Sequence, residues 1–225
     1  MPAFADHADA VAEAIVDWSR SPVTVVGHSL GAEVVVELAR RHPSLVQRAV
    51  LIGPTGDPSA GGVFGVWKRW MSCAVSEPLP FNLLTLTELA RIGPLRMAAL
   101  LRRSFQDPVE AKLPELRCPT VLVRGERDRV APAAWLDRMG RRIPDARIVT
   151  VAGSSHTLVY TDPRTLAELV MERFSRLPSQ RLDGAIGVVP GEEPGSGSGS
   201  VLGRGDMDER RQDGAERLAR GPEDR

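Results

Sequence analysis

The sequence predicts an α/β fold: a mostly parallel sheet with flanking helices and an inserted helical segment. Four short apolar runs have the length and composition of buried strands. Segments with apolar residues at helical spacing separate most of these runs, a pattern typical of βαβ units with right-handed crossovers. The long interval between the second and third runs contains several helix-like pieces, which indicates an insertion.

The first part of the chain predicts helix, strand, helix and strand in that order. A helix over 6–18 would be capped by Asp6, and a strand over 23–26 is apolar at consecutive positions, so we expect both of its faces to be covered. A helix from residue 30 to about 41 and a strand over 49–52 follow. The residues expected to be buried in the two helices are Ala8, Val11, Ala12, Ile15 and Trp18, then Leu30, Val34, Val35 and Leu38.

The rest of the chain predicts a return to the strand and helix alternation after the insertion. We expect a strand over 120–123, a helix over 133–142, a strand over 147–151 and a helix over 165–177. Glycine and serine dominate part of the remaining sequence, which indicates a disordered tail. The expected domain organisation is core 1–53, helical cap 54–113, core 114–177 and tail 178–225.

Composition excludes several classes of partner and location. The chain has 225 residues with 29 basic and 29 acidic side chains, so no bulk field would attract nucleic acid or an anionic membrane. Its two cysteines favour free thiols in a reducing cytoplasm. We expect a cytoplasmic protein with neither signal peptide nor membrane span. The four histidines are too dispersed to indicate a metal site, and no cofactor is expected.

The most informative motif is Gly27-His28-Ser29-Leu30-Gly31, which lies between a predicted strand and a predicted helix. In that context a serine at the tip of the turn adopts a strained backbone and projects its hydroxyl from the sheet edge. Small residues two positions either side would let the strand and helix approach. The backbone amide of Leu30, at the helix N-terminus, could hold a developing oxyanion. Ser29 is therefore the candidate nucleophile.

A nucleophilic serine needs a histidine base, which in turn needs a carboxylate to orient it. In a parallel sheet such groups meet at the carboxyl ends of the strands. The loop after the fourth predicted strand contains His156, and the loop after the third contains Asp128. Glu126 is the nearest alternative acid, and Asp57 is a more distant one. The candidate residues for the substrate pocket are His28, Trp67, Trp70 and Met71.

Taken together, the elbow motif, Gly125-Glu126-Arg127-Asp128 and Gly153-Ser154-Ser155-His156 make the chain resemble the α/β-hydrolase superfamily. The order Ser, Asp, His along the chain is the one that this superfamily uses. The resemblance covers about residues 6–177. It implies that Ser29 is the nucleophile, Asp128 the acid and His156 the base. It also implies that the Leu30 amide is an oxyanion donor and that the insertion is a cap.

The chain departs from this resemblance before the elbow motif, where the superfamily has several strands and a His-Gly loop that supplies a second oxyanion amide. We therefore expect the strand at 23–26 to have an open edge, to which a protein partner could bind. The expected function is a serine hydrolase acting on carboxylic esters of small apolar compounds. One alternative is a truncated, weakly active or non-catalytic protein that binds a partner chain. A further alternative is an acyltransferase, C–C hydrolase or perhydrolase using the same triad.

Overall fold

A computed structural model describes residues 3–75 and 77–171. These residues contain a four-stranded sheet whose strands lie in the order β1-β2-β3-β4, with every neighbouring pair parallel. The strands are β1 (Val23–His28), β2 (Val46–Ile52), β3 (Thr120–Gly125) and β4 (Ala146–Val151). The predicted α/β class with a parallel sheet is confirmed.

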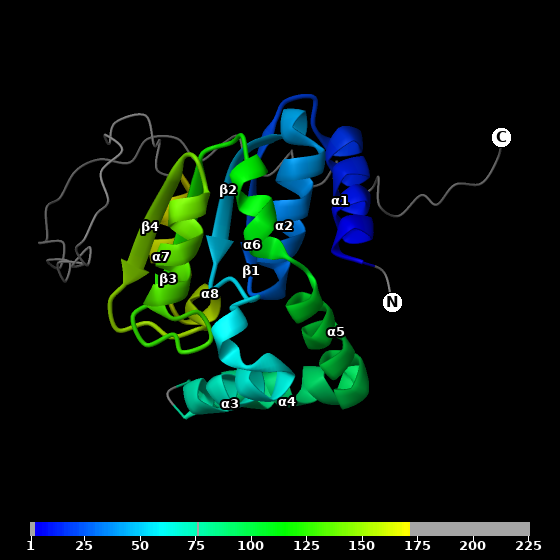
Figure 1. Cartoon of the computed structure of the whole chain (residues 1–225). Helices are drawn as coiled ribbons and strands as arrows, with labels where there is room; N and C mark the ends of the chain where they lie inside the picture. The colour runs from blue at the N-terminus through cyan, green and yellow to red at the C-terminus, as the bar shows by residue number, and fades with distance from the viewer. Residues whose placement is uncertain (1–2, 76, 172–225) are drawn as a thin grey trace, which may run out of the picture. The chain divides into compact units, whose positions relative to one another are not determined.

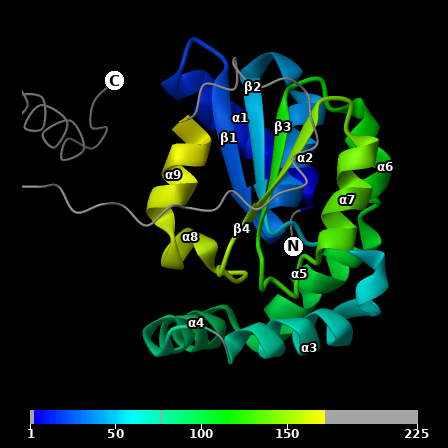
Figure 2. The same cartoon turned by 90° about the vertical axis from the view of Figure 1, so that its left-hand side faces the viewer.

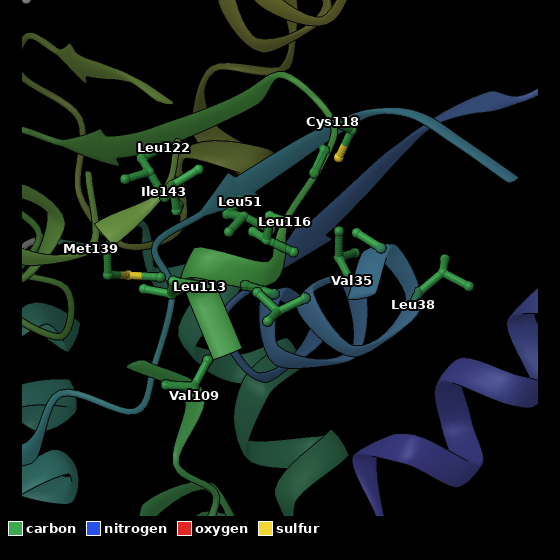
Figure 3. Packing of buried hydrophobic residues seen from close by; sticks show 14 of the residues in the cluster. Val35, Leu38, Leu51, Val109, Leu113, Leu116, Cys118, Leu122, Met139 and Ile143 are labelled. Carbon is green, nitrogen blue, oxygen red and sulfur yellow. The ribbon is translucent and has the colours of Figure 1, made fainter. Parts of the chain in front are cut away.

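Helices cover both faces of the sheet (Figure 2). One face packs against α1 (Phe4–Trp18), α2 (Leu30–Arg41), α6 (Val109–Lys112) and α7 (Ala133–Arg142), and the other against α8 (Leu158–Thr161) and α9 (Pro163–Met171). The helix α2 connects β1 to β2, and α7 connects β3 to β4. Because both connections run in the same direction across the sheet and are right-handed, the two helices lie on the same face. Figure 3 shows the larger core, to which α2 contributes Val35 and Leu38 and β2 contributes Leu51.

The segment between β2 and β3 is helical in its described part. It contains α3 (Gly62–Ala74), α4 (Leu79–Ile92) and α5 (Pro94–Gln106), with short 3₁₀ turns at Pro58–Ala60 and Leu113–Glu115. A third 3₁₀ turn, Pro43–Leu45, precedes β2. Figure 1 shows α3 and α4 beyond the ends of the strands to which the arrows point. The cap-like helices therefore lie over the carboxyl edge, where loops from different strands converge.

Several expectations about the first two elements are wrong. The helix α1 begins at Phe4, so Asp6 is not its cap; instead Asp6 accepts a hydrogen bond from the backbone amide of Ala3, three residues earlier. Val11 and Trp18 are exposed, Trp18 by 88%, because the buried stripe of α1 is narrower than the apolar one. Val26 is 43% exposed because β1 pairs only with β2 among the described residues, and its outer face is incompletely covered.

Other expectations differ only at element boundaries or fall outside the described residues. The strands β2 and β4 begin earlier than predicted, while β1 and β3 extend further. In α2, Val35 and Leu38 are buried as predicted, whereas Leu30 and Val34 are half-buried. Both cysteines are free and buried. Among the described helices, none has the length and apolar composition needed to cross a membrane. The predicted tail at 178–225 lies outside the described residues.

Candidate active site

The turn between β1 and α2 has the strained conformation that its sequence predicts. Ser29 has φ 54° and ψ −121°, and it is the only non-glycine residue with positive φ in the described part of the chain. Its backbone amide donates to the carbonyl of Ile52 at the end of β2, 2.9 Å away. A residue whose backbone is held in such an unfavourable region is a candidate functional position, because the strain must be offset by the surrounding structure.

Only one of the two glycines that flank the turn is required by its surroundings. A Cβ atom on Gly27 would lie 2.4 Å from the carbonyl oxygen of Gly31 and 2.7 Å from a methyl group of Val35. At Gly31 itself an added Cβ meets no heavy atom within 4 Å. The expectation that small residues are needed on both sides is therefore correct for Gly27 and wrong for Gly31, since the helix turns its Gly31 Cβ position towards open space.

These two glycines form a matched pair for measurement. We expect Gly27→Ala to lower the free energy of unfolding by about 1–3 kcal/mol or more, because the added methyl group clashes with backbone that cannot rotate away. Gly31→Ala should leave stability unchanged or raise it by up to about 1 kcal/mol, because alanine favours the helix. Urea unfolding at constant pH compares them. Equal stability of the two variants would contradict this account of the turn.

The structure brings three candidate residues from separate loops into one hydrogen-bonded row. The hydroxyl of Ser29 lies 3.2 Å from Nε2 of His156, and Nδ1 of His156 lies 2.9 Å from Oδ2 of Asp128. The second oxygen of Asp128 accepts the backbone amides of Val130 and Ala131, at 2.8 and 2.9 Å. Asp128 and His156 are both buried. Burial alone would raise the pKa of Asp128, but the hydrogen bonds from His156 and the two amides lower it overall.

Both alternative acids lie elsewhere. One oxygen of Glu126 accepts the backbone amide of Gly153 at 2.8 Å, so this carboxylate ties the two loops together at the surface. Asp57 is buried, and its carboxylate binds Arg69, Arg138 and Ser59. None of these hydrogen bonds joins either carboxylate to the ring of His156. Asp128 is the acid whose position fits an orienting role.

His28 lies beside this row, with its ring centre 4.9 Å from that of His156. Its Nε2 lies 2.9 Å from the backbone carbonyl oxygen of His156, so Nε2 carries the proton and donates it. Burial, followed by repulsion from His156, lowers the pKa of His28 to about 4. His28 is therefore neutral over the physiological range, and it fastens the elbow to the loop that holds the candidate base.

A cavity of about 270 Å³ opens beside Ser29 and extends under the cap-like helices. Of the four pocket candidates, His28, Trp67 and Trp70 line it, and Leu30 lines it too. Met71 is not among the lining residues, and its side chain is 42% exposed, so this one pocket prediction is wrong. The remaining lining residues, apart from Ser29 and His156, are Thr55, Val66, Phe81, Thr85, Glu88, Leu89, Ile92, Met97, Leu101, Val130 and Thr157.

The backbone amide of Leu30 directly follows the nucleophile in the chain and is a candidate donor to an oxyanion. Leu30 is the first residue of α2, and an amide at that position has no partner within the helix. The hydroxyls of Thr55, Thr85 and Thr157, which also line the cavity, already donate to Glu33, the Phe81 carbonyl and Glu77. Stabilisation of an oxyanion by the described residues would therefore depend strongly on the Leu30 amide and the positive end of α2.

One buried acid beneath this site was missed by the sequence analysis. Glu33 is 1% exposed, and its Oε1 accepts hydrogen bonds from the hydroxyls of Thr55 and Ser104, the latter on α5 of the cap-like segment. Its Oε2 is buried without a hydrogen-bond partner among the described residues. Burial raises the pKa of Glu33 to about 7, although the two hydroxyls oppose the shift. A charged residue inside the apolar pattern of α2 was the available signal.

The raised pKa of Glu33 predicts a stability that depends on pH. The folded state favours the protonated carboxyl of Glu33. This preference therefore adds its full amount to the free energy of unfolding below pH 4.5, and the added stability is lost as the pH rises past 7. At 1.36 kcal/mol per pKa unit the loss is about 3 kcal/mol. From pH 5 to pH 8, we expect the free energy of unfolding of Glu33→Gln to rise by about this amount relative to that of the unsubstituted protein. Urea unfolding at both values measures it, and a difference that does not change with pH would refute the burial argument.

Comparison with known proteins gives a consistent result. Residues 2–169 match the model of an alpha/beta hydrolase family. The chain is 26% identical over 204 residues to a pimeloyl-[acyl-carrier protein] methyl ester esterase of Aromatoleum aromaticum, covering 75% of this chain. It is 24% identical over 186 residues to the protein of the same name from Neisseria meningitidis serogroup A, covering 72% of this chain. It spans 80% and 60% of these two relatives, respectively.

Solved structures resemble the chain in fold. An alpha/beta hydrolase from a lagoon-sediment metagenome aligns with a TM-score of 0.58 at 18% identity, over 75% of this chain and 68% of that one. E-2-(acetamidomethylene)succinate hydrolase aligns with a TM-score of 0.54 at 22% identity, over 75% and 72%. At such identities the likeness establishes the architecture, and the chemistry must be argued from the residues described above.

Proposed function

Because the chain belongs to the alpha/beta hydrolase family, we propose that it is a serine esterase whose nucleophile, base and acid are Ser29, His156 and Asp128. The observation that carries the proposal is the hydrogen-bonded row joining these three side chains at the strained turn. The relatives named as methyl ester esterases support an ester as the bond that is cleaved. In this family the same constellation also performs other reactions, so the bond type is part of what must be tested.

The proposed reaction proceeds through an acyl-enzyme. The Ser29 hydroxyl attacks the ester carbonyl while its proton passes to Nε2 of His156, and the oxyanion that forms accepts the Leu30 amide. Collapse of this intermediate releases the alcohol, which takes the proton from His156. Water then gives a proton to His156 and attacks the acyl group. When the second intermediate collapses, the acid leaves and His156 returns its proton to the oxygen of Ser29. Asp128 stabilises the imidazolium in both halves.

We further propose that the substrate is small and uncharged at the end that enters the cavity. Most lining side chains are apolar; Glu88 is the only carboxylate among them, and they include no lysine or arginine. A cavity of about 270 Å³ holds roughly nine non-hydrogen atoms if each takes about the volume of a water molecule in liquid. A carboxylate there would find no cation among the lining residues, and it would lose hydration without replacement.

The experiment is a series of p-nitrophenyl esters hydrolysed by the full chain. We expect the highest kcat/KM at intermediate acyl length, a fall for acyl chains too long for the cavity, and poor use of esters that end in a carboxylate. A fluorophosphonate should abolish the activity and add its mass to the peptide that contains Ser29. Folded protein that neither hydrolyses these esters nor reacts with the fluorophosphonate would refute the proposal.

One observation favours the second candidate function, a protein that binds a partner chain. The strand β1 is at the edge of the sheet formed by the described residues, and Val26 on it is 43% exposed. An edge strand offers backbone amides and carbonyls to an incoming strand. The outcome that refutes the esterase, folded protein without turnover or labelling, is the one that favours this alternative.

A further inference from the structure

A buried guanidinium lies behind the acid of the candidate triad. Arg124, near the end of β3, is 8% exposed. Among the described residues no carboxylate forms a salt bridge with it; its hydrogen bonds go to the backbone carbonyls of Glu126, Asp128 and Ala131, at 3.0, 3.0 and 3.1 Å. Burial lowers the pKa of Arg124, against the attraction of nearby acids that include Asp128. A buried cation without an ion pair is costly, so a compensating role is expected.

The three carbonyls belong to the loop that carries Asp128. The planar guanidinium has five donors in a fixed arrangement and therefore joins three points of the loop at once. The opposite side of the loop is held by the loop that carries His156. Arg127 donates its amide to the carbonyl of Ser154 at 2.8 Å, and a Cβ on Gly125 would lie 2.4 Å from the carbonyl oxygens of Ser154 and Ser155. The acid loop is thus held between Arg124 and the base loop.

This arrangement leaves the carboxylate of Asp128 without a hydrogen bond to Arg124. The Arg124 bond at this residue uses the backbone carbonyl, while Oδ1 binds two amides and Oδ2 faces Nδ1 of His156. We propose that Arg124 is a positioning residue for the proposed esterase: by binding three carbonyls of the acid loop, it fixes the carboxylate of Asp128 against His156. The inference rests on the proposed function for its kinetic readout, but not for its structural one.

The kinetic test compares Arg124→Met, Arg124→Lys and Arg127→Met, a control at an exposed position of the same loop. Rates are divided by the number of active sites titrated with a fluorophosphonate, so unfolded protein does not count. We expect Arg124→Met to lower kcat by about 10- to 100-fold with KM within about twofold, because a misplacement near 1 Å costs about 10². Arg124→Lys should recover part of the loss, and the control should match the unsubstituted protein.

A double-mutant cycle separates positioning from general destabilisation. If Arg124 acts through Asp128, then Arg124→Met adds little once Asp128→Asn has already removed the function of the carboxylate. A purely structural role would instead multiply the two losses. Multiplicative losses, or an unchanged kcat per titrated site in Arg124→Met, would overturn the proposal while leaving the esterase itself intact.

A readout independent of turnover is the proton NMR signal of the Nδ1–H group of His156, which its hydrogen bond to Asp128 protects from exchange. We expect the signal in the unsubstituted protein and in Arg127→Met, and its loss or broadening in Arg124→Met and, less completely, in Arg124→Lys. Circular dichroism verifies that each variant is folded. If the chain has no esterase activity, this signal still tests the inference, and its persistence in folded Arg124→Met refutes it.

Discussion

Replacing Ser29 by alanine is expected to lower kcat for ester hydrolysis by about 10³- to 10⁶-fold and to abolish fluorophosphonate labelling. The oxygen of the Ser29 hydroxyl forms the bond to the acyl group, and alanine has no atom that can replace it. The variant should fold as well as the unsubstituted protein, because alanine and serine both carry a Cβ and bear the same strain at φ 54°. Steady-state kinetics and thermal unfolding give the two measurements.

A companion variant and a control sharpen this prediction. His156→Ala should cost a similar factor, and the double variant should cost no more than either single one, because the two residues act as one unit. Ser72→Ala is the matched control, since the hydroxyl of Ser72 binds a carbonyl within α3 and lies away from the turn. Substantial hydrolysis by Ser29→Ala, above a blank purified in parallel, would assign the activity to another group and end the present interpretation.

The site could be anticipated because its chemistry restricts where its parts can be. A parallel sheet gathers the ends of its strands at one edge, so a serine after the first apolar run, an acid after the third and a histidine after the fourth were expected to meet there. The structure brings Ser29, Asp128 and His156 together at that edge. The strained backbone of the turn followed from the same strand-to-helix context.

Other features depend on contacts that no local pattern contains. Glu33 and Arg124 are charged residues in segments whose patterns predict an ordinary helix and strand. A charge inside an apolar pattern is a weak signal, and the roles of these residues become clear only from their contacts with Ser104 and the acid loop. Met71 and Trp70 are neighbours in sequence, but the orientation of α3 over the sheet decides which one lines the cavity. Val26 belongs to an apolar run, yet its position on an edge strand leaves it exposed.

The choice of Asp128 over Glu126 as the acid leads to a second prediction with a large effect. In Asp128→Asn the remaining oxygen would still accept the amides of Val130 and Ala131, which lie 2.8 and 2.9 Å from Oδ1. The new amide group would then face Nδ1 of His156 as a donor. Nδ1 must accept, so the proton moves to Nε2, and a protonated Nε2 cannot take the proton of Ser29. We expect kcat to fall by about 10⁴ with the fold retained.

Glu126→Gln is the control for the same loop, because the Glu126 carboxylate binds the amide of Gly153 and does not contact His156 in the hydrogen bonds of the site. Its kcat should stay within about threefold of the unsubstituted value, as is usual for a side chain that bonds one surface amide. Measuring both variants at one pH, per titrated active site, compares the two carboxylates directly. If Glu126→Gln lost activity and Asp128→Asn kept it, Glu126 would be the functional acid, and its carboxylate would have to reach His156 through a rearrangement of the loop. The buried contact between Asp128 and His156 would then be structural rather than catalytic.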